Sequence, residues 1–143
     1  MAWRCRIPFL CLAVLAAVLG CGKSAAPPAD TGSAGAAREY GEAVCRRDWP
    51  RAYALLHPDS RRRYSAEQFA RLAATYRQGI GFEPEKVQLW NCEERDAEAT
   101  ARVVFRGRAA SQGRRYNEAV TLQRSDDGWQ VVLPLNFGTV KKR

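Results

Sequence analysis

The spacing of hydrophobic residues along the chain changes near Pro84. Between about residues 37 and 81, apolar side chains recur three and four positions apart, which places them on one face of a helix. Beyond Pro84 they alternate with polar residues, the period of a half-buried strand. The pattern therefore predicts three helices followed by four strands. The helical stripes are Ala37–Cys45, Trp49–Leu56 and Phe69–Ile80.

Local signals mark where these helices begin and end. Asp48 is a residue type that caps helices, and Pro50 follows in the first turn, where its missing N–H is harmless. Pro58 ends that helix, because the residue before a proline is driven out of the helical conformation. Ser65–Gln68 has the Ser-x-x-Gln spacing of a capping box and starts the third helix.

Four stretches carry the period-two pattern. A hairpin turn at Ser125–Gly128 joins the last two. The sequence does not decide which residues of the first strand face the core. Val87 and Leu89 would face it in one alternation, and Trp90 and Cys92 in the other. Helices followed by an antiparallel four-stranded sheet make an α+β domain, and this order excludes a parallel nucleotide-binding sheet. The apolar positions of the other strands are Ala97 to Phe105, then Tyr116, Val120 and Leu122, then Trp129 to Leu135.

The N-terminus has the organisation of an export signal. Met1–Arg6 is cationic, and the thirteen residues Ile7–Leu19 carry no charge. That length is short of the ~20 residues of a membrane-spanning helix and fits the apolar region of a secretory signal. Val18–Cys21 resembles the lipobox of bacterial lipoproteins. An ordinary signal peptide with an incidental cysteine is the alternative.

The lipobox resemblance implies that residues 1–20 are removed and that Cys21 becomes lipidated. In that family the cysteine carries a diacylglyceryl thioether and an acylated amine, with acyl chains such as palmitate. Two or more chains hold a protein stably at a membrane, whereas one does not. The resemblance thus places the protein in the bacterial cell envelope, on the periplasmic face of the outer membrane in a Gram-negative host.

Residues 21–37 are expected to be a lipidated flexible linker. Gly22–Ala37 is rich in Ala, Gly, Ser and Pro and has no apolar periodicity. Sixteen flexible residues reach roughly 20–25 Å. A helix through the alanines is the alternative, which Pro27 and Pro28 disfavour. The folded domain is then expected over residues 38–143.

The helical half resembles a known fold family. The run Asp48–Leu56, with Tyr40 before it and Ser65–Phe69 after it, resembles the opening of nuclear transport factor-like domains. This superfamily includes ketosteroid isomerase and the SnoaL-like polyketide cyclases. The resemblance implies a cone-shaped domain in which helices close a curved sheet around a pocket. Such a fold hosts enzymes, binders and assembly subunits, so function must come from the site.

Five residues are candidates for lining such a pocket. Glu118 and Arg102 are charges on otherwise apolar strands, and Tyr53, Tyr76 and Trp129 supply aromatic surface. A carboxylate inside a cone can act as a general base with a raised pKa. The alternatives are a solvated carboxylate and aromatic residues that only fill the core. No catalytic motif of the family matches residue by residue, so no catalytic residue is assigned.

The remaining cysteines and the single histidine limit the chemistry. Cys45 and Cys92 are the two thiols left after processing and lipidation, and an oxidising envelope favours a disulfide between them. Two separately buried thiols are the alternative. One histidine excludes a multi-histidine metal site within one chain, and no cofactor is expected.

Charge narrows the choice of partners. The chain has 23 Lys and Arg against 15 Asp and Glu, a net charge of +8, which becomes +6 when Arg4 and Arg6 leave with the signal. An exported basic protein meets anionic lipid headgroups and acidic polymers, and no nucleic acid partner is expected. A solvated basic surface is the plain alternative. The basic groups are Arg61–Arg63, Arg106 with Arg108, Arg114 and Arg115, and Lys141–Arg143.

The sequence as a whole predicts an envelope-anchored lipoprotein with a non-catalytic domain. Its expected partners are the membrane through the lipid anchor, an envelope protein or a small apolar ligand, and a second copy of the chain. The alternative is a small-molecule isomerase or cyclase in which Glu118 and a tyrosine form the acid–base pair.

Overall fold

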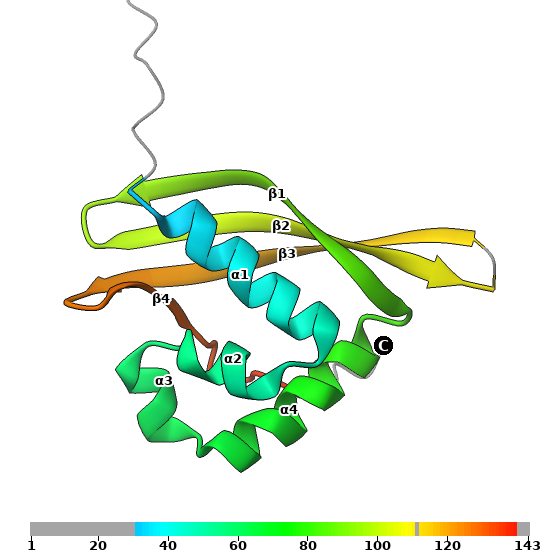
Figure 1. Cartoon of the computed structure of the whole chain (residues 1–143), viewed down its shortest axis with the longest axis horizontal. Coiled ribbons are helices and arrows are strands. Elements are labelled where there is room, and N and C mark those ends of the chain that lie inside the picture. Colours follow the sequence, from blue (N-terminus) through cyan, green and yellow to red (C-terminus); the bar gives the residue numbers. More distant parts are fainter. Residues whose placement is uncertain (1–30, 111, 140–143) are drawn as a thin grey trace, which may run out of the picture.

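The computed structural model describes residues 31–110 and 112–139, and within them four helices precede a four-stranded sheet (Figure 1). The helices are α1 (Ser33–Arg46), α2 (Trp49–Ala54), α3 (Pro58–Arg63) and α4 (Ala66–Gly79). The strands are β1 (Glu83–Arg95), β2 (Glu98–Ala109), β3 (Gln112–Ser125) and β4 (Gly128–Val132).

The two predicted helix starts are confirmed. The Asp48 side chain accepts a hydrogen bond from the backbone N–H of Arg51 at 3.1 Å. Ser65 and Gln68 form a reciprocal capping box, with bonds of 2.9 and 3.2 Å. Each cap satisfies backbone donors that have no partner inside the helix.

Helix α1 begins earlier than the expected boundary between residues 37 and 38. It starts at Ser33, and Ser33 and Ala37 are fully buried. Small residues let this helix lie close to the sheet: a Cβ on Gly41 would stand 2.8 Å from a methyl group of Val87. The linker prediction is therefore wrong for residues 33–37, and Cys21 and the signal lie outside the described residues.

A short helix follows the predicted helix end at Pro58. Pro58 occupies the first position of α3, where the absence of its N–H costs nothing. The His57 Nδ1 accepts from the Asp59 N–H at 3.3 Å and caps this helix. The His57 N–H donates to the Val131 carbonyl at 2.8 Å, which ties the segment to β4.

The strands pair antiparallel in the order β1-β2-β3-β4. Their alternating residues face the helices on one side, called here the inner face, and solvent on the other, the outer face. Helix α1 lies across the inner face (Figure 1). The buried hydrophobic residues form one cluster contributed by helices, strands and the C-terminal segment. All of its members lie between Ala36 and Phe137, so the described domain contains its own core.

A β-bulge decides the open question of the first strand. The β1–β2 register shifts between Leu89 and Asn91, so Trp90 is an inserted residue. Val87 and Leu89 face inward before the bulge, and Cys92 faces inward after it. Trp90 is 72% exposed. The phase of Val87 and Leu89 is thus correct before the bulge, whereas of the other phase only Cys92 faces inward.

The C-terminal segment after β4 packs under α4. Phe137 is buried there, and Gly138, at φ +74°, passes so close to Leu72 that a Cβ would meet its backbone oxygen at 2.8 Å. The Leu133 N–H donates to the buried Ser60 hydroxyl at 2.9 Å. Leu135 is exposed, so the last position of the predicted apolar stripe is wrong because the strand has already ended at Val132.

Candidate functional site

The structure brings Glu118 and Tyr76 together between α4 and the sheet. On β3 the alternation that turns Val120 inward also turns Glu118 inward, directly opposite Val103 of β2. On α4, Tyr76 follows Phe69 and Ala73 along the packed side of the helix. The Tyr76 hydroxyl donates a hydrogen bond to Glu118 Oε2 at 3.2 Å. This is the arrangement of a carboxylate held by a neutral phenol.

Two tyrosines are affected by this carboxylate, Tyr76 through its hydrogen bond and Tyr40 through the charge of Glu118. Burial, and secondarily the charge of Glu118, raises the pKa of Tyr76 far above its ordinary value of 10. The same two causes raise the pKa of Tyr40, which is buried on α1. Neither phenol ionises near neutral pH, so neither acts there as a base. Chemically, the cluster can polarise or hydrogen-bond a group that reaches Glu118.

Aromatic rings fill the space around this pair. Phe137 stacks on Phe69 at 5.8 Å between ring centroids and on Tyr76 at 5.4 Å. Phe69 is fully buried and also contacts the Tyr53 ring at 5.7 Å. Such offset aromatic pairs pack a core well. The C-terminal segment therefore occupies, with Phe137, part of the interior in which a ligand of the cone would lie.

Of the other three candidate pocket residues, Tyr53 adjoins this aromatic group through Phe69, whereas Trp129 and Arg102 lie elsewhere. Tyr53 packs its ring in the core and donates its hydroxyl to the Tyr64 carbonyl at 3.0 Å. Trp129 lies near the N-terminus of α1 and donates its indole N–H to the Thr31 hydroxyl at 2.7 Å. Arg102 is exposed on the outer face of β2. The prediction of one shared pocket is wrong for Trp129 and Arg102, because the sequence pattern does not fix where along the sheet a side chain lies.

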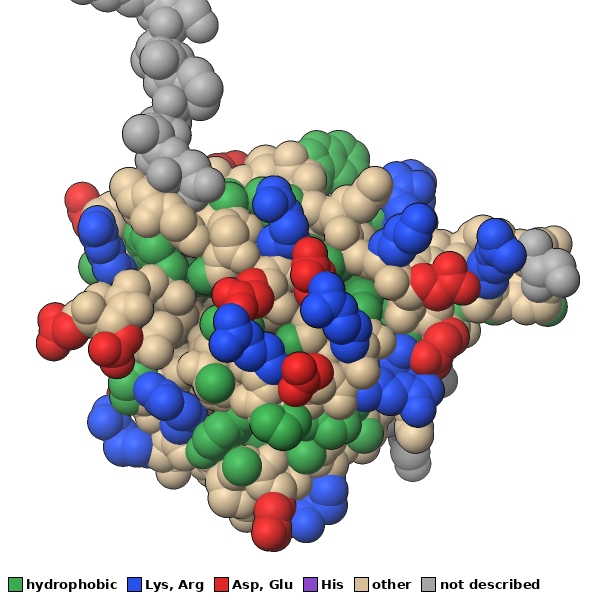
Figure 2. All heavy atoms as spheres, viewed as in Figure 1, with side chains coloured by type: hydrophobic (Ala, Val, Ile, Leu, Met, Phe, Trp, Pro, Cys, Tyr) green, Lys and Arg blue, Asp and Glu red, His purple; other side chains and the backbone are tan. Residues whose placement is uncertain are grey.

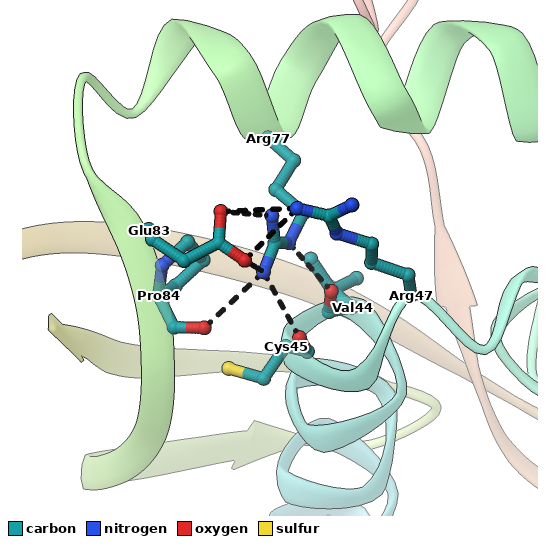
Figure 3. A network of polar contacts seen from close by, with 6 residues as sticks. All are labelled: Val44, Cys45, Arg47, Arg77, Glu83 and Pro84. Carbon is teal, nitrogen blue, oxygen red and sulfur yellow. Dashed lines mark hydrogen bonds and ion pairs between the residues drawn. The ribbon is translucent and has the colours of Figure 1, made fainter.

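The sequence analysis missed a buried arginine on α4. Arg77 donates to the carbonyls of Val44 at 3.2 Å and Cys45 at 3.1 Å, and at 3.4 Å to that of Pro84 (Figure 3). It also binds the Glu83 carboxylate with two donors, one of them at 2.6 Å. The side chain thus joins the last turn of α1, α4 and the start of β1. It donates to two carbonyls at the C-terminal end of α1, of which that of Val44 also accepts from the Arg47 N–H.

Arg77 and Arg47 hold Glu83 as a carboxylate. Arg47 donates to both Glu83 oxygens, at 3.1 and 3.2 Å. Chiefly through the hydrogen bonds of Arg77, the pKa of Glu83 falls to about 2. A surface hollow of about 390 Å³ lies beside this network. It is lined by Arg47, Trp49, Ala74, Arg77, Gln78, Phe82 and Glu83.

The predicted disulfide is not formed. Cys92 lies beside the start of α1, with its sulfur 3.0 Å from the Ser33 hydroxyl, whereas Cys45 lies in the last turn of that helix. Twelve residues of helix separate these ends by about 18 Å, and a disulfide requires Cα atoms within ~7 Å. The two residues are not joined to each other. Burial raises the pKa of the Cys45 thiol to about 11, so it is not a thiolate nucleophile at neutral pH.

The described residues contain neither a cluster of metal ligands nor a membrane-spanning helix. In residues 31–110 and 112–139, no three His, Cys, Asp or Glu side chains converge as a metal site would require. Among the same residues, no helix has both the length and the hydrophobicity to cross a bilayer.

Comparison with known proteins supports the fold. No protein-family model matches the chain, and neither does any curated protein. Among solved structures, it is similar to a Campylobacter jejuni protein named an NTF2-like transpeptidase, with a TM-score of 0.52 and 13% identity over 68% of this chain and 94% of that one. A SEC-C motif containing protein from Rhodopseudomonas palustris gives a TM-score of 0.52 and 11% identity, over 67% and 71% of the two chains.

At such low identity these likenesses bear on the fold alone. Together with the helices followed by an antiparallel sheet, they confirm the predicted α+β class and a nuclear transport factor-like (NTF2-like) fold.

Proposed function

We propose that this protein is a lipid-anchored component of the bacterial cell envelope whose NTF2-like domain is a non-catalytic binding or interaction module. The proposed anchor is Cys21, on the strength of the Val18–Cys21 motif after an uncharged stretch of signal length. The proposed partners are an envelope protein, a small apolar ligand or a second copy of the chain.

The packing of the interior is the observation that supports an interaction module most directly. Phe137 stacks between Phe69 and Tyr76, and Glu118 is engaged by Tyr76. A pocket enzyme needs room for its substrate beside the reacting group. With aromatic rings in that place, the surface of the domain is the better candidate for recognition.

The anchor is tested by acylation of the full chain in a bacterial host. With Cys21→Ala we expect loss of labelled palmitate and release of the protein from the membrane fraction. Cys11→Ala is the matched control, because it removes a cysteine from the apolar stretch and leaves the motif intact. Equal labelling of the wild type and Cys21→Ala would refute the anchor.

A specific observation also favours a second candidate, a small-molecule enzyme of the isomerase or cyclase type. The hydrogen bond from Tyr76 to Glu118 is the pairing that such chemistry uses, with the carboxylate as base and a phenol as donor. This candidate requires that the C-terminal segment move away and admit a substrate.

The two candidates are separated by Glu118→Gln and Tyr76→Phe. Both changes keep the shape of the side chain and remove its acid–base capacity. In a strain that lacks the gene, an interaction module predicts that both variants restore the wild-type phenotype. The enzyme predicts that Glu118→Gln fails while the folded protein accumulates to the normal level.

A further inference from the structure

The outer face of the sheet carries a row of cations that spans three strands. The register places Lys86 of β1 opposite Arg106 of β2, and Arg106 opposite Arg115 of β3. All three side chains are exposed. Directly opposite side chains on one face of a sheet have Cβ atoms ~5 Å apart, so three positive charges lie side by side.

Two further arginines extend this row along β2. Arg102 and Arg108 have the same alternation as Arg106 and are exposed on the same face. We call these residues, Lys86, Arg102, Arg106, Arg108 and Arg115, the basic sheet face. Among the described residues, none of them forms an ion pair with an acidic side chain. The Arg106 Nε donates to the uncharged Gln88 Oε1 at 2.6 Å.

Two acidic residues of β1 adjoin this cluster. Glu83 lies opposite Arg108 in the register, but its carboxylate is bound by Arg77 and Arg47. Glu85 occupies a second bulge of β1, beside Lys86. Glu93 and Glu98 belong to the other end of the outer face, where Arg95 lies opposite Glu98. Like charges directly opposite one another destabilise a sheet, so this arrangement is unfavourable for the isolated domain and is relieved by an anionic partner.

We propose that the basic sheet face docks the domain on an anionic bilayer surface. This rests on the proposed lipid anchor, which would keep the domain at the membrane. Each Lys or Arg near anionic lipid strengthens the attraction of a polybasic surface, and a chain anchored by acyl groups often uses such a second signal. Trp90, exposed in the neighbouring bulge of β1, is of a residue type enriched at the headgroup level.

The length of chain after Cys21 permits this orientation. Thr31 is bonded to Glu94, which lies opposite Ala99 at the far end of the sheet from Arg106. Seven residues of β2 separate Ala99 from Arg106, about 23 Å. The ten peptide units from Cys21 to Thr31 span at most about 35 Å when fully extended. The anchor therefore leaves the basic sheet face free to lie against the bilayer.

A second copy of the chain is a poorer occupant of this face. A two-fold interface brings the same patch of both subunits together. Two copies of the Lys86–Arg106–Arg115 row would then repel each other. Anionic lipid has the complementary charge and a surface broad enough for a sheet.

The test uses the chain from Gly22 to Arg143, which retains the whole described core and lacks Cys21. Its partitioning is measured by co-sedimentation with vesicles of phosphatidylcholine alone, or with about 30% phosphatidylglycerol, at ~50 mM and ~0.5 M salt. We expect binding only to the anionic vesicles, with most of it lost at the higher salt. Arg106→Gln with Arg115→Gln should weaken this binding at least about tenfold.

A matched pair on the helix side is the control. Arg46→Gln with Arg51→Gln makes the same change in net charge at exposed positions, and should weaken binding no more than about threefold. Equal losses for the two pairs, or equal partitioning to both vesicle types, would overturn the proposal. So would binding to a soluble acidic polysaccharide with none to anionic vesicles.

The outcome is independent of acylation, because the tested chain has no Cys21. A failed anchor with retained vesicle binding would remove the proposed function and leave the docking face in place. A confirmed anchor without vesicle binding would leave the proposed function in place and remove the docking face.

Discussion

The helix side and the outer sheet face of this domain both display arginine, but in opposite electrostatic settings. On the helix side, Figure 2 shows positive and negative side chains interleaved over α1. Arg46 pairs with Glu42 at 2.8 Å, and Arg51 pairs with Glu39. On the outer sheet face, Arg106 has Lys86 and Arg115 as its direct neighbours across the strands.

The difference separates two uses of the same residue type. On the helix side, Glu42 lies one turn from Arg46 on α1, and Glu39 of α1 meets Arg51 of α2, so these charges are paired within the chain. The strands place cation opposite cation, so their charges remain for a partner. Net charge alone does not identify the face that binds, because the paired arginines contribute to it as much as the unpaired ones.

The largest effect on stability is expected from Arg77, the buried arginine of the helix side. Arg77→Met keeps most of the apolar stem but removes the donors for the Val44 and Cys45 carbonyls. Loss of bonds from a charged donor to buried acceptors should lower the free energy of unfolding by about 3 kcal/mol. Urea denaturation measures this.

Arg71→Met on the same helix is the control for Arg77→Met. Arg71 is exposed, and its replacement should change stability by less than about 0.5 kcal/mol. Similar losses for both variants would mean that burial of Arg77 does not distinguish it from a surface arginine.

An intermediate effect is expected from Glu83, the acid that Arg77 and Arg47 share. Its pKa is lowered from 4.5 to about 2 in the folded state, chiefly by the Arg77 hydrogen bonds. The stabilisation from its ionised form is therefore complete above pH 4.5 and is lost as the pH falls toward 2. Because its side chain is 56% exposed, solvent weakens the effect.

Glu83→Gln isolates this contribution. The wild type should be more stable than the variant at neutral pH, and the difference should shrink between pH 4.5 and 2, as followed by urea denaturation at several pH values. A difference that stays constant over that range would contradict the assignment.

The smallest expected effect is on stability, where two exposed arginine substitutions should change the free energy of unfolding in opposite directions. Arg115→Gln removes a like-charge neighbour and should stabilise the domain by a few tenths of a kcal/mol, whereas Arg51→Gln breaks an ion pair and should destabilise it by a similar amount. Both changes in the free energy of unfolding should diminish at high salt, because exposed charges are screened. Denaturation at low and high salt measures them, and the same sign for both variants would break the comparison.

Much of the fold follows from periodicity and capping chemistry. Asp48 and Ser65 start helices as their side chains predict, and the four strands pair in chain order. The start of α1 was missed because Ser, Ala and Gly resemble a linker in composition, although here they permit close packing on β1. The first strand was ambiguous because the bulge at Trp90 shifts the alternation midway.

The candidate site was predictable only in part. The alternation on β3 correctly turns Glu118 inward, and the stripe on α4 correctly packs Tyr76. Their meeting depends on how far α4 stands from the sheet, which no local pattern encodes. The distance between Cys45 and Cys92 likewise depends on the tertiary packing of α1 on the sheet. Arg77 was missed because an arginine on a helix is usually exposed and its carbonyl partners leave no mark in the sequence.

The two bulges of β1 also bear on how the edge of the sheet avoids pairing with strands of other chains. β1 is an edge strand of thirteen residues, long enough to recruit a strand from another unfolded chain. Register shifts beside Glu85 and at Trp90 interrupt its regular ladder, and Lys86 and Glu93 add charge along it. Straightening this strand by deleting Trp90 would offer a continuous template for aggregation. The irregular edge thus protects the chain from its own copies.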